Sequence, residues 1–132
     1  MKAQRPVSVI QAIVAAANRG NVDDMVDLFA EDAVLKLDPE LPGLRPVYQG
    51  RLQIREYLQQ MVTNGFKVDA GDYQAIDDGV SWRSTVSGGL FGERGGQVTS
   101  HAIVQANQVL SVTIHYSPEA VRTLQSALAE RV

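Results

Sequence analysis

Apolar residues recur with a helical period in the first half of the chain. One stripe with i, i+3, i+4, i+7 spacing consists of Ile10, Ile13, Val14 and Ala17. Gly20 is predicted to end this helix, and Asn21 to cap a second, short one with the apolar face Val22, Met25, Leu28 and Phe29. A third helix is predicted from Gly50 to the stop signal Asn64-Gly65, with the apolar face Ile54, Tyr57, Leu58 and Met61.

The spacing changes to strand alternation elsewhere. Residues 33–38, rich in branched and apolar residues, predict a strand, and the proline-rich residues 39–49 predict a loop. Four further strands are predicted between residues 66 and 116, where apolar residues alternate with polar ones. They are separated by the turn signals Asp77-Asp78-Gly79 and Asn107-Gln108 and by the glycine-rich connection 88–96. Consecutive strands joined in this way favour an antiparallel meander.

A last helix is predicted at the C-terminal end. Ser117-Pro118-Glu119 combines a cap, a proline for the first helical position and an acid near the positive end of the helix dipole. The helix is expected to reach about Glu130, with the apolar stripe Val121, Leu124 and Leu128. The whole order predicts one α+β domain over residues 1–132, in which helices lie across a curved antiparallel sheet and enclose an apolar pocket.

The composition of the chain limits the kinds of partner and site that we expect. The 132 residues are 45% hydrophobic and 20% charged, with a net charge of −3, so no basic surface for nucleic acid is expected. The chain has no cysteine, and its two histidines are 14 residues apart, so neither a disulfide nor a metal site is predicted. No apolar run reaches the length of a membrane span, and no signal peptide is predicted. We therefore expect a cytoplasmic protein without a membrane partner.

Several segments resemble the nuclear transport factor 2-like superfamily, and its SnoaL-like members in particular. They are Gly20-Asn21-Val22-Asp23, the segment 28–34, Gly50 followed by residues 54–58, and the segment 111–128. The resemblance covers nearly the whole chain. It implies a cone-shaped sheet, antiparallel or mixed, covered by the three N-terminal helices, with an extra C-terminal helix. It also implies a pocket on the concave face and a homodimer formed through the outer face.

Ketosteroid isomerases of this superfamily use an aspartate base on the first strand, together with a tyrosine and an acid that hold an oxyanion. The matching position for the base is Leu37, and a one-residue bulge would be needed to turn Asp38 inward. The resemblance places the tyrosine position at about Ile13 and the oxyanion acid near Thr99 or His101.

Asp38 and His101 are the candidate catalytic residues. Asp38 could act as a general base if burial raised its pKa, or it could be a solvated acid at a strand end. His101 is suited to acid–base chemistry near neutral pH. It points into the pocket if Thr99 and Ile103 line it, and outward if the core face consists of Val98, Ala102 and Val104. His115 is expected on the outer face.

Aromatic side chains are the candidate ligand contacts, because rings supply apolar area and a phenol or indole adds a polar group. We expect the pocket to be formed by Leu37, Tyr48, Tyr57, Trp82 and Tyr116. Core packing is the alternative for Trp82 and Tyr57, whereas Tyr48 in the proline-rich loop is the candidate for the rim.

Two functions are compatible with these residues. The first is an isomerase, cyclase or dehydratase that needs no cofactor and acts on a small apolar molecule through His101 or Asp38. A phenol of Tyr48 or Tyr116 would donate to the developing oxyanion. The second is a non-catalytic module that binds a small ligand or forms dimers.

Overall fold

The computed structural model describes residues 4–38, 45–77, 79–92 and 95–130. The predicted turn residue Asp78, the loop residues 39–44, residues 93–94 and the side chain of Leu128 lie outside the described part. The elements are α1 (Gln4–Arg19), α2 (Val22–Val26), β1 (Phe29–Asp38), β2 (Val47–Gln49), α3 (Gly50–Thr63), β3 (Lys67–Ile76), β4 (Gly79–Ser87), the 3₁₀ helix η1 (Gly89–Phe91), β5 (Gly96–Gln105), β6 (Gln108–Tyr116) and α4 (Pro118–Glu130).

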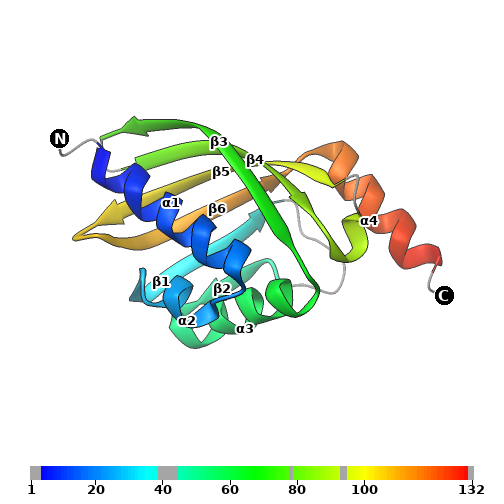
Figure 1. Cartoon of the computed structure of the whole chain (residues 1–132), viewed down its shortest axis with the longest axis horizontal. Coiled ribbons are helices and arrows are strands. Elements are labelled where there is room, and N and C mark those ends of the chain that lie inside the picture. Colours follow the sequence, from blue (N-terminus) through cyan, green and yellow to red (C-terminus); the bar gives the residue numbers. More distant parts are fainter. Residues whose placement is uncertain (1–3, 39–44, 78, 93–94, 131–132) are drawn as a thin grey trace.

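The strands form one six-stranded mixed sheet in the order β2-β1-β6-β5-β4-β3. Strands β3 to β6 pair antiparallel with their neighbours in sequence, which confirms the predicted meander. Strand β1 lies parallel to β6 and antiparallel to β2. Figure 1 shows α1 crossing one face of this curved sheet, with α2 and α3 beside it and α4 at the far end. The α+β cone expected from the sequence is therefore confirmed.

Two predicted boundaries were wrong. Leu28 and Phe29 were assigned to the second helix, but α2 ends at Val26 and Phe29 begins β1, because the carbonyl of Leu28 accepts a hydrogen bond from Val109 in β6. The loop predicted over residues 39–49 contains β2, in which Tyr48 pairs with Leu35 of β1. In both cases long-range strand pairing prevails over the local pattern.

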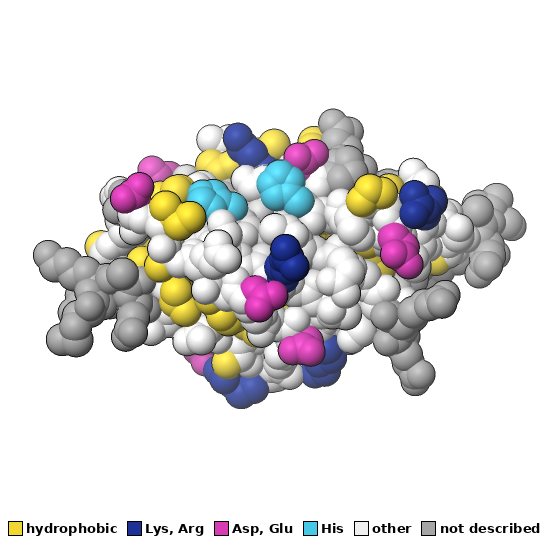
Figure 2. Space-filling model, turned by 90° about the horizontal axis from the view of Figure 1, so that it is seen from above, with side chains coloured by type: hydrophobic (Ala, Val, Ile, Leu, Met, Phe, Trp, Pro, Cys, Tyr) yellow, Lys and Arg dark blue, Asp and Glu magenta, His cyan; other side chains and the backbone are white. Residues whose placement is uncertain are grey.

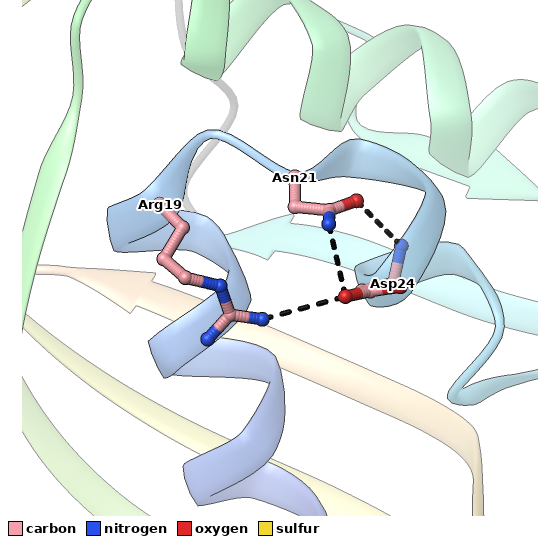
Figure 3. A network of polar contacts seen from close by, with 3 residues as sticks. All are labelled: Arg19, Asn21 and Asp24. Atoms are coloured by element: carbon pink, nitrogen blue, oxygen red, sulfur yellow. Dashed lines mark hydrogen bonds and ion pairs between the residues drawn. The ribbon is translucent and has the colours of Figure 1, made fainter.

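The predicted cap between α1 and α2 is confirmed. The side-chain oxygen of Asn21 accepts a hydrogen bond from the backbone N–H of Asp24 at 3.1 Å, and its amide donates to the Asp24 carboxylate at 2.9 Å (Figure 3). Arg19 lies 3.4 Å from the same carboxylate. This network satisfies an otherwise unpaired N–H at the start of α2 and sets the turn between the two helices.

The concave face of the sheet carries the core. Leu35, Val112, Ala102 and Val80 form one row across β1, β6, β5 and β4, and all four are buried. Because side chains alternate along a strand, the residues before and after each of these four on its own strand point to the outer face of the sheet. Among the described residues, no helix combines the length and the apolar character needed to span a bilayer.

Hydrogen bonds from Asn18 connect α1 to the edge strand of the sheet. Its amide group donates to the backbone carbonyl of Val68 and accepts from the N–H of the same residue, both at 2.8 Å. Lys67 adds a bond from its ammonium group to the Asn18 carbonyl at 2.9 Å. The side chain thus takes the place of a neighbouring strand at this position of the edge strand β3, and it holds α1 across the concave face.

Candidate functional site

The helices and the concave sheet face surround a cavity of about 150 Å³. Residues from all three N-terminal helices and from strands β1, β3, β4, β5 and β6 line it. The lining includes the half-buried residues Ile13, Val14, Ala17, Met61 and Val62. Phe66, Val68 and Ile114 are half-buried lining residues as well, so the part of the lining nearest to solvent extends from α1 and the end of α3 to the sheet.

Among the described residues, five of those that line the cavity carry polar side-chain atoms: Tyr57, Trp82, Ser84, Ser100 and Tyr116. None of the described lining residues is charged or a histidine. Ser84 and Ser100, 5% and 4% exposed, are the polar residues buried on the sheet floor. They lie diagonally to each other on β4 and β5, because Ser84 pairs with Val98 and Ser100 with Trp82. The cavity is therefore apolar with a few hydroxyl groups.

Tyr57 on α3 and Tyr116 on β6 place their phenol oxygens 3.3 Å apart. Both rings are buried, and they are held by further aromatic contacts. The Tyr57 ring lies 5.1 Å from that of Tyr48, and the Tyr116 ring stacks on Phe91 at 6.0 Å. We refer to Tyr57 and Tyr116 as the phenol dyad. Together with Ser84 and Ser100, it accounts for the hydroxyl groups among the described lining residues.

Burial raises the pKa of Tyr57 well above its usual value of 10.0, and the neighbouring Tyr116 raises it further. Burial also raises the pKa of Tyr116, although its hydrogen bond with Tyr57 acts in the opposite direction. Both phenols are therefore protonated at neutral pH and act as neutral hydrogen-bonding groups rather than as bases.

This pKa shift predicts a loss of stability at high pH. Because the folded-state pKa of Tyr57 lies above its unfolded value, the stability linked to this ionisation is fully present below pH 10. As the pH rises beyond 10, the free energy of unfolding decreases by about 1.4 kcal/mol per pH unit. Replacing Tyr57 with Phe should make the decline less steep. Urea unfolding between pH 8 and 11 measures the difference, and parallel curves for the two proteins would contradict the prediction.

The structure places both candidate catalytic residues outside the cavity. Val98, Ala102 and Val104 are buried, so His101 points outward, where its Nδ1 lies 3.0 Å from the hydroxyl of Ser81. Asp38 is also on the outer face, 3.1 Å from Nδ1 of His115, with 64% of its side chain exposed. The β1–β6 register has an irregularity between Phe29 and Val34, but it leaves Leu37 buried and Asp38 exposed, and the register is regular from Val34 to Asp38.

The outer face of the sheet, which carries Asp38 and His101, lies opposite the face that lines the cavity. Figure 2 shows both histidines close together on one face, among mostly uncharged polar side chains and scattered charges. Among the residues described, no group of three or more His, Asp or Glu side chains is arranged to hold a metal ion. The homodimer expected through this face stays a prediction.

The ligand-contact candidates divide into two groups. Tyr57, Trp82 and Tyr116 line the cavity, whereas Leu37 and Tyr48 are buried beside it without lining it. Tyr48 was expected at the rim because of its proline-rich surroundings. That expectation was wrong, because β2 pairs Tyr48 with Leu35, and its phenol oxygen accepts a hydrogen bond from the N–H of Arg45 at 3.2 Å.

Two polar lining residues, Ser84 and Ser100, were not singled out as site residues from the sequence. Ser84 was placed in an alternating strand with Trp82 and Val86, and this shared spacing was the signal that could have identified it as an inward-facing residue. Ser100 gave no comparable signal, because the direction of β5 was open until its pairing was known.

Helices packed across the concave face of a six-stranded mixed sheet, around an apolar cavity, define a protein of the nuclear transport factor 2-like class. The SnoaL-like domain family matches residues 10–116, and the chain belongs to that family. A comparison with curated protein sequences finds no match.

Solved structures with the same fold share little sequence with the chain. Bal32a, from a soil-derived mobile gene cassette, has a TM-score of 0.80 at 16% identity, with 93% of this chain and 97% of that chain covered. An LEH-like epoxide hydrolase of M. tuberculosis gives 0.73 at 16% identity, covering 99% and 97%. The epoxide hydrolase/cyclase-like enzyme SalBIII gives 0.72 at 19% identity, covering 89% and 94%. At these identities the likeness extends to the fold alone.

Proposed function

We propose that this protein binds a small, largely apolar molecule in the cavity between its helices and the sheet. The observation that carries the proposal is the lining of the cavity, in which apolar side chains surround a few hydroxyl groups. Such sites typically combine an apolar wall with a small number of polar groups that fix the ligand's orientation. The volume of about 150 Å³ suits a body the size of benzene.

Acid–base catalysis is the second candidate, and the names of two neighbours, an epoxide hydrolase and an epoxide hydrolase/cyclase-like enzyme, favour it. An enzyme of this kind needs a group that takes a proton from the substrate. Within the described part of the chain, no carboxylate or imidazole lines the cavity, and both phenols retain their protons at neutral pH. The lining therefore supports binding better than proton transfer.

Trp82 provides a direct test, because it is the only tryptophan of the chain and it lines the cavity. Titration with benzene should give a saturable change in tryptophan fluorescence that corresponds to one site. Replacing Ser100 with Leu should weaken this binding at least tenfold, since the larger side chain occupies space on the cavity floor.

The neighbouring residue on the same strand is the matched control. His101→Ala changes the outer face and should leave the affinity for benzene as in the wild type. Thermal unfolding of both variants establishes that each is folded. A linear, unsaturable fluorescence response in the wild type, or equal binding by the Ser100→Leu variant, would count against the cavity as the binding site.

A further inference from the structure

Two hydroxyl groups that line the cavity are without a partner in the described part of the chain. The phenols of Tyr57 and Tyr116 hydrogen-bond each other, whereas Ser84 and Ser100 make no hydrogen bond to any described residue. Both serines are buried, at 5% and 4% exposed. No side-chain oxygen or nitrogen that lacks a partner is sealed off from solvent among the described residues, so both serine oxygens open onto the cavity that they line.

The strand register places the two serines close together on the cavity floor. Ser84 on β4 pairs with Val98 of β5. Ser100 pairs with Trp82, two residues before Ser84 on the same strand, so the two serines are diagonal neighbours on one face of the sheet. Diagonal neighbours have Cβ atoms about 7 Å apart, and each hydroxyl can turn toward the other. Two hydrogen bonds of about 2.8 Å can therefore join both serines to one oxygen atom of a ligand.

We propose that Ser84 and Ser100 form a subsite for a hydroxyl group, so that the ligand is a small alcohol with an apolar body. The inference rests on the proposed binding function and adds the chemical class of the ligand. A ligand hydroxyl accepts a hydrogen bond from one serine and donates one to the other. The three hydroxyls then form a chain in which each bond polarises the next, whereas a carbonyl or ether oxygen only accepts and ends the chain.

The remaining described lining disfavours a charged ligand. A carboxylate or phosphate would lose its hydration without meeting an Arg, Lys or His side chain among these residues, and an ammonium group would meet no Asp or Glu. The cavity volume of about 150 Å³ limits the apolar body to about one six-membered ring. A monocyclic alcohol whose hydroxyl group faces the sheet meets these conditions.

Cyclohexanol, cyclohexanone and methylcyclohexane are suitable probes, because they differ in little more than the hydroxyl, carbonyl or methyl group on the ring. Calorimetry measures the affinity of each probe for the wild type and for the double variant Ser84→Ala/Ser100→Ala. The double variant should lower the affinity for the alcohol relative to the hydrocarbon about fivefold or more, which corresponds to two net hydrogen bonds. The affinity for the ketone relative to the hydrocarbon should fall less.

Ser81 is the matched control, because it lies on the same strand as Ser84 but on the outer face, 3.0 Å from Nδ1 of His101. Ser81→Ala removes a serine hydroxyl outside the cavity and should preserve the wild-type ratios of affinity. Thermal unfolding establishes that each variant is folded.

Nuclear Overhauser contacts in the wild type test the orientation of the alcohol without a substitution. The proton on the hydroxyl-bearing carbon of bound cyclohexanol should contact the β-protons of Ser84 and Ser100. Contacts from the opposite end of the ring, unchanged ratios in the double variant, or an equal loss for ketone and alcohol overturn the hydroxyl subsite while binding in the cavity stands. Failure of all three probes to bind the wild type overturns the proposed function as well.

Discussion

Replacement of Ile54 with Ala is expected to lower the free energy of unfolding by about 2–5 kcal/mol. Ile54 lies on the face of α3 that packs against the sheet, and it is 0% exposed. Truncation removes buried methyl and methylene groups and leaves a void that the surrounding core fills only in part. Urea denaturation monitored by circular dichroism measures the change.

Leu52, on the opposite face of the same helix, is the matched control. It is 81% exposed, so Leu52→Ala removes a side chain of similar size from solvent and should change the stability by no more than about 0.5 kcal/mol. Both substitutions introduce alanine into α3, which makes the effects on helix propensity comparable. Similar losses for the two variants would show that the buried face of α3 contributes little to the core.

The second large effect is expected at Gly88, before η1. Its backbone has φ 89° and ψ 175°, a conformation essentially restricted to glycine, and an added Cβ would overlap the carbonyl oxygen of Gly65. Gly88→Ala therefore combines backbone strain of about 1–3 kcal/mol with a further steric cost of about 1–3 kcal/mol. The sum is expected to lower the unfolding midpoint in urea strongly.

Gly92, at the other end of η1, separates these two contributions. It has a similar backbone conformation, with φ 66° and ψ −162°, but an added Cβ would meet no atom of the described residues within 4 Å. Gly92→Ala should thus cost only the strain, about 1–3 kcal/mol. If the two alanine variants unfold at the same urea concentration, the close approach of Gly88 to Gly65 does not contribute to stability.

Local patterns were sufficient to predict most of the elements. The stripe from Ile10 to Ala17 corresponds to α1, and the signal Ser117-Pro118-Glu119 stands at the start of α4. These predictions succeeded because helix periodicity and capping depend on residues within one or two turns. The turn predicted at Asn107-Gln108 lies one residue earlier, because Ala106 and Asn107 join β5 to β6 and Gln108 already belongs to β6, where it pairs with Gln105.

Features that depend on distant partners were missed or left open. Three residues among prolines do not predict β2, which exists because Tyr48 pairs with Leu35. The alternation along β5 offered two directions for His101, and the sequence did not choose between them. The pairing of Val98 with Tyr116 and of Ala102 with Val112 turned the other set inward and left His101 outside.

The candidate site also combines features that the sequence predicted with features that depend on distant residues. The sequence by itself determined most of the segments that become helices and strands, and it supplied Tyr57, Trp82 and Tyr116 as aromatic candidates, because these properties follow from local spacing and residue type. Only the tertiary structure decided that Tyr57 and Tyr116, 59 residues apart, both line the cavity with their phenol oxygens 3.3 Å from each other, while Asp38 and His101 face away from it. Facing and proximity depend on long-range strand pairing and helix packing, which are not encoded in any single stretch of chain.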